Sequence, residues 1–341
     1  MDLLRRTACH VTAIDTAVRV GTSGINYHRK RIRAHARAVW SLLRLRQVNP
    51  RALYVGGAGG NGLWYQFAVI LVGSLLGFRI VFHHHSYAYL NQRRLAMRFI
   101  ARVPLRGGCH IVLCGAMDRA FRGIYGPVAR VVVISNSTLL KRPRSLRSLR
   151  RPSQNDGLTL GHLSNLTIEK GLPDVIRTLE AFQGAGLPAS LRLAGPIQTD
   201  QAREAIAEAS KRFGDTLQYV GPIPPGEVDN FLCDLDVFLF PSRYRNEAEP
   251  LVVIEATRLG VPVFAFDRGC IAEIIRPNGV AVPADADFPT IVLEQATSIL
   301  GSPRSREKRG RSPELPIDVQ HKDPDKYRLI RLLFDDRSGT G

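Results

Sequence analysis

Short apolar runs alternate along the first 136 residues with longer segments whose apolar residues recur at helical spacing. The runs at 52–57, 79–82, 110–114 and 131–135 are typical of buried strands, and the run at 10–14 would serve as an earlier strand. Helices are expected at 28–47, 63–76 and 117–124. Strands that alternate with helices in this way indicate a parallel, doubly wound sheet.

The alternation stops after residue 136 and resumes at 158. Strands are expected at 158–163, 190–195, 217–221, 237–242 and 261–266, and helices at 173–182, 201–213, 228–232, 251–259 and 271–275. Residues 141–151 are a basic linker, 301–325 are polar and rich in proline, and 327–334 could form a closing helix. The predicted fold is α/β, with one Rossmann-like domain over 1–151, a second over 152–300, and a loose segment with a terminal helix over 301–341. Two such domains facing a cleft would bind ligands at the carboxyl ends of their strands.

Two apolar segments raise the question of a membrane. The stretch 63–82 is long enough to span one, but Gly73, Gly77 and Arg79 interrupt it, so we predict a helix, a turn and a strand. In the helix expected at 28–47, an apolar stripe is flanked by arginines. Such a stripe can lie on an anionic bilayer or pack against the sheet, and both interpretations stay open. The stripe consists of Ile32, Ala36, Val39, Trp40 and Leu43.

Charge is divided unevenly between the two halves. The chain has a formal net charge of +17; residues 1–155 hold 26 lysines and arginines and three acidic residues, whereas the remainder is net acidic. The basic half is expected to meet an anionic partner such as a membrane surface, and no sequence context of a nucleic-acid-binding module accompanies it. The five cysteines show no CxxC spacing, and residues 1–11 lack the apolar core of a signal peptide. We therefore expect a reduced, cytoplasmic protein without a structural metal, bound peripherally to the inner face of the cell membrane.

The segment 238–275 is the most informative about chemistry. Glu247 and Glu255 are separated by seven residues. Glu247 precedes the helix that starts near Pro250 and Leu251, with Pro250 expected in its first turn, and Glu255 lies one turn further into that helix. The N–H groups at a helix start suit a diphosphate, and a carboxylate can accept two hydrogen bonds from a ribose diol.

This segment resembles the donor-binding signature of family 4 glycosyltransferases of the GT-B fold, in which two glutamates flank seven residues. The resemblance extends to 161–171, where Lys170 stands at the position of the family's diphosphate-binding lysine; it covers 156–285 well and 50–136 more loosely. It implies that Glu247 contacts the transferred sugar, Glu255 the ribose, and Lys170 the diphosphate, where a preorganised cation would stabilise the leaving group.

The sequence departs from the family pattern in three places. Ala248, Glu249 and Pro250 replace the usual Gly-Phe-Gly, as in a variant associated with bacterial surface-polysaccharide enzymes. Asn165 stands where the family has a basic donor-binding residue, and Arg243 or Arg245 would replace that phosphate contact. Finally, the family has a strand, a Gly-rich loop and a helix before the strand that 10–14 resembles, so the N-terminal domain is expected to lack its first strand.

Three consecutive histidines end the strand at 79–82. They resemble the family's His-x-His position, and His85 is the residue expected to contact the reacting sugar or the acceptor. Packed or exposed histidines without a role are the alternative. A metal site is not expected, because successive strand residues alternate faces and no carboxylate accompanies them.

The resemblance implies a retaining hexosyltransferase without a cofactor, which moves a sugar from a donor such as a UDP- or GDP-sugar to a glycan or lipid-linked acceptor in polysaccharide or cell-envelope biosynthesis. Two alternatives remain open: a catalytically degenerate protein that acts as a binding or scaffold subunit, and an epimerase of sugar nucleotides. A nucleic-acid-binding protein is not expected.

Overall fold

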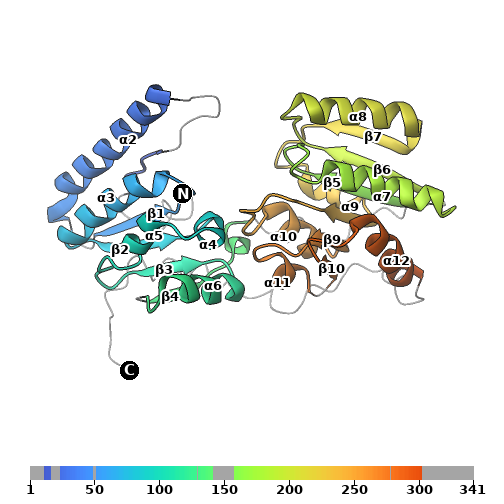
Figure 1. Cartoon of the computed structure of the whole chain (residues 1–341). Coiled ribbons are helices and arrows are strands. Elements are labelled where there is room, and N and C mark those ends of the chain that lie inside the picture. The colour runs from blue at the N-terminus through green and yellow to red at the C-terminus, as the bar shows by residue number, and fades with distance from the viewer. Residues whose placement is uncertain are drawn as a thin grey trace. The chain divides into compact units, whose positions relative to one another are not determined.

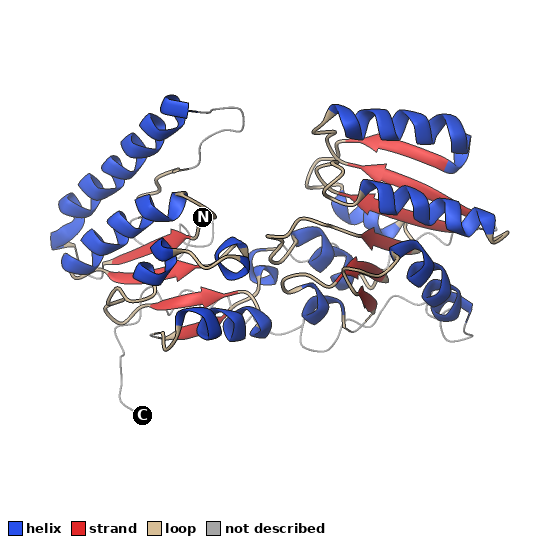
Figure 2. Ribbon diagram, in the orientation of Figure 1, coloured by secondary structure: helices blue, strands red, loops and turns tan. Residues whose placement is uncertain are grey.

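The computed structural model describes residues 11–16, 24–48, 51–128, 130–140, 157–276 and 278–301. The chain divides into two compact units, with the boundary between Thr138 and Leu139, and each unit is built on a parallel sheet with helices (Figures 1 and 2). The expected α/β class with two Rossmann-like domains is confirmed. The expected boundary at 151–152, the linker at 141–151 and the segment at 302–341 lie outside the described residues.

Unit 1 carries a four-stranded parallel sheet in the order β1-β2-β3-β4. The strands are β1 (Ala52–Gly56), β2 (Arg79–His83), β3 (Cys109–Val112) and β4 (Val131–Val133). Helices α3 (Gly62–Leu75), α4 (Ala88–Asn91), α5 (Leu95–Ile100) and α6 (Gly115–Tyr125) lie between them in sequence. The strand expected at 10–14 is wrong for its described part: residues 11–16 are irregular and none of them is buried. An apolar run forms a strand only where it can pair with a sheet and bury its side chains.

The apolar stretch 63–82 forms a helix, a turn and a strand, as predicted. Gly77 adopts a φ of 78° at the turn, and a Cβ on Gly73 would lie 2.8 Å from Leu53, so glycine lets α3 approach the sheet closely. Among the described helices, none is long and apolar enough to cross a bilayer.

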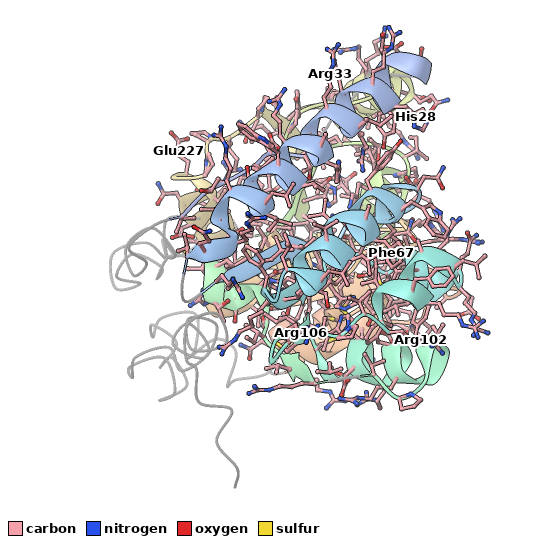
Figure 3. All side chains as sticks on the ribbon, turned by 90° about the vertical axis from the view of Figure 1, so that its left-hand side faces the viewer. His28, Arg33, Phe67, Arg102, Arg106 and Glu227 are labelled. Atoms are coloured by element: carbon pink, nitrogen blue, oxygen red, sulfur yellow. The ribbon has the colours of Figure 1, made fainter. Side chains whose placement is uncertain are left out.

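The basic helix α2 (Gly24–Arg44) is followed by a short 3₁₀ turn, Leu45–Gln47, and runs beside α3 (Figure 3). Its inner face places Leu42 against Val69 and Phe78. The stripe singled out in the sequence largely faces outward, with Trp40 53% exposed. Burial of that stripe against the sheet is therefore wrong, because α2 uses a neighbouring face for packing.

Unit 2 holds a six-stranded parallel sheet in the order β10-β9-β8-β5-β6-β7. Its strands are β5 (Leu158–Leu163), β6 (Ala189–Ala194), β7 (Leu217–Gly221), β8 (Val237–Phe240), β9 (Val263–Phe266) and β10 (Gly279–Val282). Its helices are α7 (Leu172–Gly184), α8 (Asp200–Phe213), α9 (Val228–Cys233), α10 (Leu251–Arg258), α11 (Ile271–Ile275) and α12 (Phe288–Gly301). From β5 the chain builds outward through β6 to β7, then returns to β8 on the other side of β5. The strand order reverses between β5 and β8.

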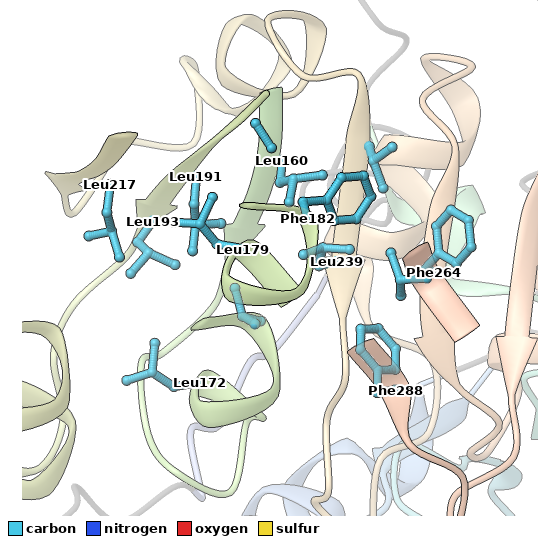
Figure 4. Close-up of a cluster of buried hydrophobic side chains, with 14 of the residues drawn as sticks. Leu160, Leu172, Leu179, Phe182, Leu191, Leu193, Leu217, Leu239, Phe264 and Phe288 are labelled. Atoms are coloured by element: carbon cyan, nitrogen blue, oxygen red, sulfur yellow. The ribbon is translucent and has the colours of Figure 1, made fainter. Parts of the chain in front are cut away.

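Alternate residues of these strands enter two cores on opposite faces of the sheet. Leu239 packs in the core with α7 and α12, and its neighbours Phe238 and Phe240 belong to the core with α9 and α10. Phe182 of α7 reaches the first core (Figure 4). Burial on both faces explains why these strands are continuously apolar, and it fixes the ends of β5 and β8, where the loops of the site begin.

Candidate functional site

The loops that follow β5 and β8 meet at the point where the strand order of unit 2 reverses. β5 and β8 are paired neighbours, and the loops after parallel strands leave from the same edge of the sheet. In open α/β sheets this reversal is where ligands bind, because the two loops diverge there. Lys170 follows β5 and Glu247 follows β8.

Lys170 and Glu247 form the central contact of this site. The Lys170 Nζ lies 2.6 Å from Glu247 Oε2, and their side chains are 24% and 11% exposed. The Ser242 hydroxyl donates to the same carboxylate oxygen at 2.9 Å. The ammonium also lies 5.0 Å from the centre of the Tyr244 ring. An ammonium has three N–H donors and the bond to Glu247 uses one, so Lys170 can hold Glu247 and an anionic ligand together.

Gly171 brings the two loops into contact. It adopts a φ of 85°, and a Cβ there would overlap the Pro241 carbonyl oxygen. In addition, the Arg243 backbone N–H donates to the Glu169 carbonyl at 2.8 Å. Only a residue without a side chain allows this approach, which places Lys170 beside Glu247.

Arg243 is held by an acidic partner on α7. Its Nε and Nη2 donate to the two carboxylate oxygens of Asp174 at 2.8 and 3.0 Å, and this paired hydrogen bonding raises the pKa of Arg243. Asp174 is 3% exposed. The guanidinium thus links the loop after β8 to the first turn of α7, and a phosphate contact by Arg243 stays a prediction.

The loop that carries Glu247 ends at the N-terminus of α10. Pro250 is the N-cap, one residue earlier than the first-turn position expected for it, and Leu251 opens the helix with 46% exposure. Gly269 supports the loop from behind: a Cβ there would overlap the Glu247 and Ala248 carbonyl oxygens. The Cys270 N–H also donates to the Ala248 carbonyl at 2.8 Å.

Glu255 lies one turn into α10 and is half-buried. Desolvation raises its pKa, the nearby Asp229 raises it further, and Arg258 lowers it. Glu247 and Glu255 are thus carried by different elements: Glu247 is tied to Lys170 and Ser242, and Glu255 is influenced by charges on α9 and α10. A ribose contact by Glu255 stays a prediction.

Beneath the site, His162 of β5 is fully buried. Its Nδ1 lies 2.8 Å from the Leu239 carbonyl oxygen, which can only accept, so Nδ1 carries the proton and Nε2 accepts from Ser164. Burial lowers the pKa of His162 to about 4, and the positive charge of Lys170 contributes to the lowering. Asn165 follows in the bend after β5 and is exposed; its role as a donor contact stays a prediction.

The histidine triplet of unit 1 divides into two packed residues and one exposed residue. His83 and His84 are fully buried, whereas His85 lies beyond the end of β2 and is exposed. Burial, with a smaller contribution from His85, lowers the pKa of His83 to about 3. His84 bonds to the Tyr89 hydroxyl at 2.8 Å, and its ring lies 5.2 Å from that of His110. The packed alternative is therefore correct for His83 and His84, and His85 is the only one of the three that can reach a ligand.

Several residues of the site were not singled out by sequence reasoning. Asp174 and His162 act through contacts with residues 69 and 77 positions away, for which a single sequence gives no signal. Ser242 contacts Glu247 from five residues away within the same loop, but a serine in a polar loop does not stand out in the sequence. Gly171 and Gly269 could have been found, because a glycine beside a charged loop residue often marks a close backbone approach. Among the described residues, no group of histidine, cysteine, aspartate and glutamate side chains could hold a metal ion.

Sequence comparison finds a likeness to a known family in this unit. Residues 149–311 match the family model described as glycosyl transferases group 1. The chain is 28% identical over 150 residues to the O-antigen biosynthesis glycosyltransferase WclY of Escherichia coli, a match that covers 42% of this chain and 37% of that protein. It is 26% identical over 177 residues to the putative colanic acid biosynthesis glycosyltransferase WcaL of Salmonella typhimurium, covering 48% of this chain and 42% of that protein. These matches span less than half of the relatives' own lengths.

Structure comparison covers both units. Anabaena HepE in complex with UDP and glucose matches with a TM-score of 0.64 at 15% identity, over 88% of this chain and 81% of that chain. Sucrose-phosphate synthase from Thermosynechococcus elongatus matches with a TM-score of 0.64 at 17% identity, over 92% of this chain and 82% of that chain. At this identity the likeness establishes the fold. The two units therefore have the GT-B fold of solved glycosyltransferases, and within it residues 149–311 match the group 1 family of glycosyl transferases.

Proposed function

We propose that the chain is a glycosyltransferase that moves a hexose-type sugar from a nucleotide-sugar donor to a glycan or lipid-linked acceptor in polysaccharide or cell-envelope biosynthesis. The observation that carries the proposal is the Lys170–Glu247 pair with Ser242 at the strand-order reversal of unit 2, inside the segment that matches the group 1 family. The names of the relatives support the pathway class, since they refer to O-antigen, colanic acid and amylovoran biosynthesis.

The roles follow from the charges. Transfer breaks the bond between the anomeric carbon and a diphosphate oxygen, and negative charge then develops on the leaving diphosphate. Lys170 would stabilise that charge, assisted by the N–H groups at the start of α10 near Leu251. Glu247, oriented by Ser242, would contact the transferred sugar, and Glu255 would bind the ribose diol.

Further parts of the proposal rest on the family resemblance and on exposure. Asn165 and Arg243 would complete the donor side, and His85 would be the contribution of unit 1 to the reacting sugar or the acceptor. The reaction would retain the anomeric configuration and need no cofactor. The basic unit 1 would draw the protein to an anionic membrane surface on the cytoplasmic side, where a lipid-linked acceptor is presented.

The test is a panel of UDP- and GDP-sugars incubated with the purified full chain, with and without acceptor extracts. We expect release of one nucleoside diphosphate, retention of configuration in the transferred sugar, and loss of turnover in Lys170→Ala and in Glu255→Ala. The matched control is Lys211→Ala, an exposed lysine on α8, which should leave turnover unchanged. Full activity in both site variants would refute the assignment of the donor site.

One alternative has specific support. Asn165 replaces a basic residue, and the guanidinium of Arg243, its candidate substitute, is engaged by Asp174. A catalytically degenerate binding or scaffold subunit would bind a nucleotide-sugar in titration calorimetry and yet neither hydrolyse nor transfer it. Product analysis in the same assay separates an epimerase, which would return an altered sugar nucleotide.

A further inference from the structure

The outward side of α3 is apolar along its whole length. Trp64, Ala68, Leu71 and Leu75 recur at helical spacing on that side and all are exposed, Leu75 to 72%. The helix contains no charged residue. A surface helix normally turns polar residues to water, so this exposed stripe needs a partner.

The neighbouring helix α5 extends the stripe sideways. Leu95 is 63% exposed and Phe99 is 47% exposed. The rings of Trp64, Phe67 and Phe99 form a triangle with centroid separations of 5.6 to 6.3 Å. We call the exposed side chains of Trp64, Ala68, Leu71, Leu75, Leu95 and Phe99 the outer apolar face. Contiguous exposed apolar surface of this kind marks a binding surface.

Arginines border the outer apolar face. In Figure 3, Phe67 of α3 lies between Arg33 of α2 on one side and Arg102 and Arg106 on the other. Arg98 on α5 is exposed as well. Within the described part of the chain, no ion pair joins these arginines to a carboxylate. The sequence between Asp15 and Asp118 contains no acidic residue at all.

We infer that the outer apolar face is the surface by which this chain binds an anionic bilayer, with Trp64, Leu71, Leu75 and Phe99 entering the boundary of the acyl chains and the bordering arginines on headgroup phosphates. The inference specifies the surface for the membrane binding advanced under the proposed function. An exposed apolar centre with tryptophan and an arginine border is the chemistry of an interfacial membrane contact.

Two other occupants fit the observations less well. A nucleic acid would contact the arginines, but Leu71, Leu75 and Leu95 offer bases no stacking surface and would stay exposed. A second copy of the chain, docked symmetrically, would bring two arginine borders together without a carboxylate between them. A bilayer of anionic lipid satisfies both the apolar centre and the charged border.

The two tryptophans of the chain, Trp40 and Trp64, make this test direct, because both lie on exposed sides of the α2–α3 pair. The full-length protein with Trp40→Phe reports from Trp64 alone. With vesicles of phosphatidylcholine and phosphatidylglycerol, we expect its emission to shift to the blue and to be quenched by lipids brominated on the acyl chains. Vesicles of phosphatidylcholine alone should bind at least about tenfold more weakly, since each well-placed arginine contributes a factor of about five.

Variants that place glutamate on the face or on its arginine border locate the surface. Leu71→Glu with Leu75→Glu should lower vesicle binding by about tenfold or more, and Arg98→Glu with Arg102→Glu should do so in a salt-dependent way. The matched controls on unit 2, with the same changes of net charge, are Gln218→Glu with Val220→Glu and Arg203→Glu with Lys211→Glu, all at exposed positions. All of these positions face solvent, and thermal melts confirm that each variant folds.

Each other outcome overturns the inference. Vesicle binding without quenching of Trp64 would mean charge attraction alone. A blue shift that appears without lipid and rises with protein concentration would mean a second copy. Equal loss of binding in the controls would mean that net charge decides. A failure of the proposed function can be distinguished from a failure of this inference, because vesicle binding needs no nucleotide-sugar and the nucleotide-sugar assay needs no vesicles.

Discussion

Replacing Lys170 by alanine tests whether the central ion pair of unit 2 serves chemistry or only stability. In the folded protein the ammonium lies 2.6 Å from Glu247, with both side chains mostly shielded from water. After this change the Ser242 hydroxyl still donates to the Glu247 carboxylate. Coulomb attraction at this distance is about 6 kcal/mol at an effective dielectric constant of about 20, but desolvation of the two charges offsets much of it.

The expected net loss in the free energy of unfolding is about 2 kcal/mol, between the values for exposed and fully buried pairs. A protein with an ordinary stability of about 5–15 kcal/mol stays folded after such a loss. The loss in turnover should be much larger, about 10²- to 10³-fold, because an electrostatic group that stabilises charge in the transition state typically contributes that much.

Denaturant unfolding and nucleotide-sugar turnover, measured on the same preparations, separate the two roles. Lys211→Ala, at an exposed position on α8, controls for the loss of one positive charge. In a purely structural pair, Lys170→Ala with Glu247→Gln would recover much of the stability, since no unpaired charge remains. Turnover of Lys170→Ala within about threefold of the parent would refute a leaving-group role for this lysine.

Three further predictions follow from the geometry of unit 2. Gly171→Ala should lower the free energy of unfolding by about 2–4 kcal/mol and reduce turnover, because the residue has a φ of 85° and its Cβ would overlap the Pro241 carbonyl. The control is Gly184→Ala at the end of α7, where a Cβ meets nothing within 4 Å, and it should change stability by less than about 1 kcal/mol. Similar melting curves for the two variants would contradict the close approach at Gly171. Glu255→Gln should weaken the binding of UDP or GDP about tenfold in calorimetry, whereas the binding of their 2′-deoxy forms should change little. Because burial raises the pKa of Glu255, binding should also weaken as pH falls toward the usual carboxyl range. Equal losses for the ribose and the 2′-deoxy nucleotides would exclude the ribose contact. Burial lowers the pKa of His162 to about 4, so between this value and the ordinary pKa the unfolded chain binds a proton that the folded chain does not. The free energy of unfolding should therefore fall by about 3 kcal/mol as pH drops from 6.5 to about 4. His162→Gln should lack that part of the pH dependence, and the same pH dependence in the variant and the parent would show that His162 is charged when folded.

The sequence alone predicted the architecture, because that information lies in local periodicity. Continuous apolar runs and helical spacing placed most strands and helices of both units, and Gly73 and Gly77 correctly indicated a helix and a turn in place of a membrane span. The elements that were not predicted are α4, α5, β10 and α12. The run at 10–14 was an error of the opposite kind: it has the composition of a strand, but a strand also needs a partner, and residues 11–16 remain irregular.

For the site, the sequence indicated candidate residues, and only the tertiary structure showed which of them are in contact. Motif spacing singled out Lys170, Glu247 and Glu255, yet the spacing joins the two glutamates, whereas the fold joins Lys170 to Glu247 across 77 residues. The reversal of strand order and the missing side chain of Gly171 create that contact, and neither is a local property of the chain.

The sequence pattern also did not determine whether an apolar side chain faces the core or the solvent. An apolar stripe on a helix is the same in sequence whether it is buried or exposed, and packing of α2 through Leu42 rather than Trp40 decided the matter. Local periodicity thus determines which elements form, because it depends on neighbours along the chain. Pairing, close approach and exposure depend on residues far apart in sequence, and only the folded structure brings those together.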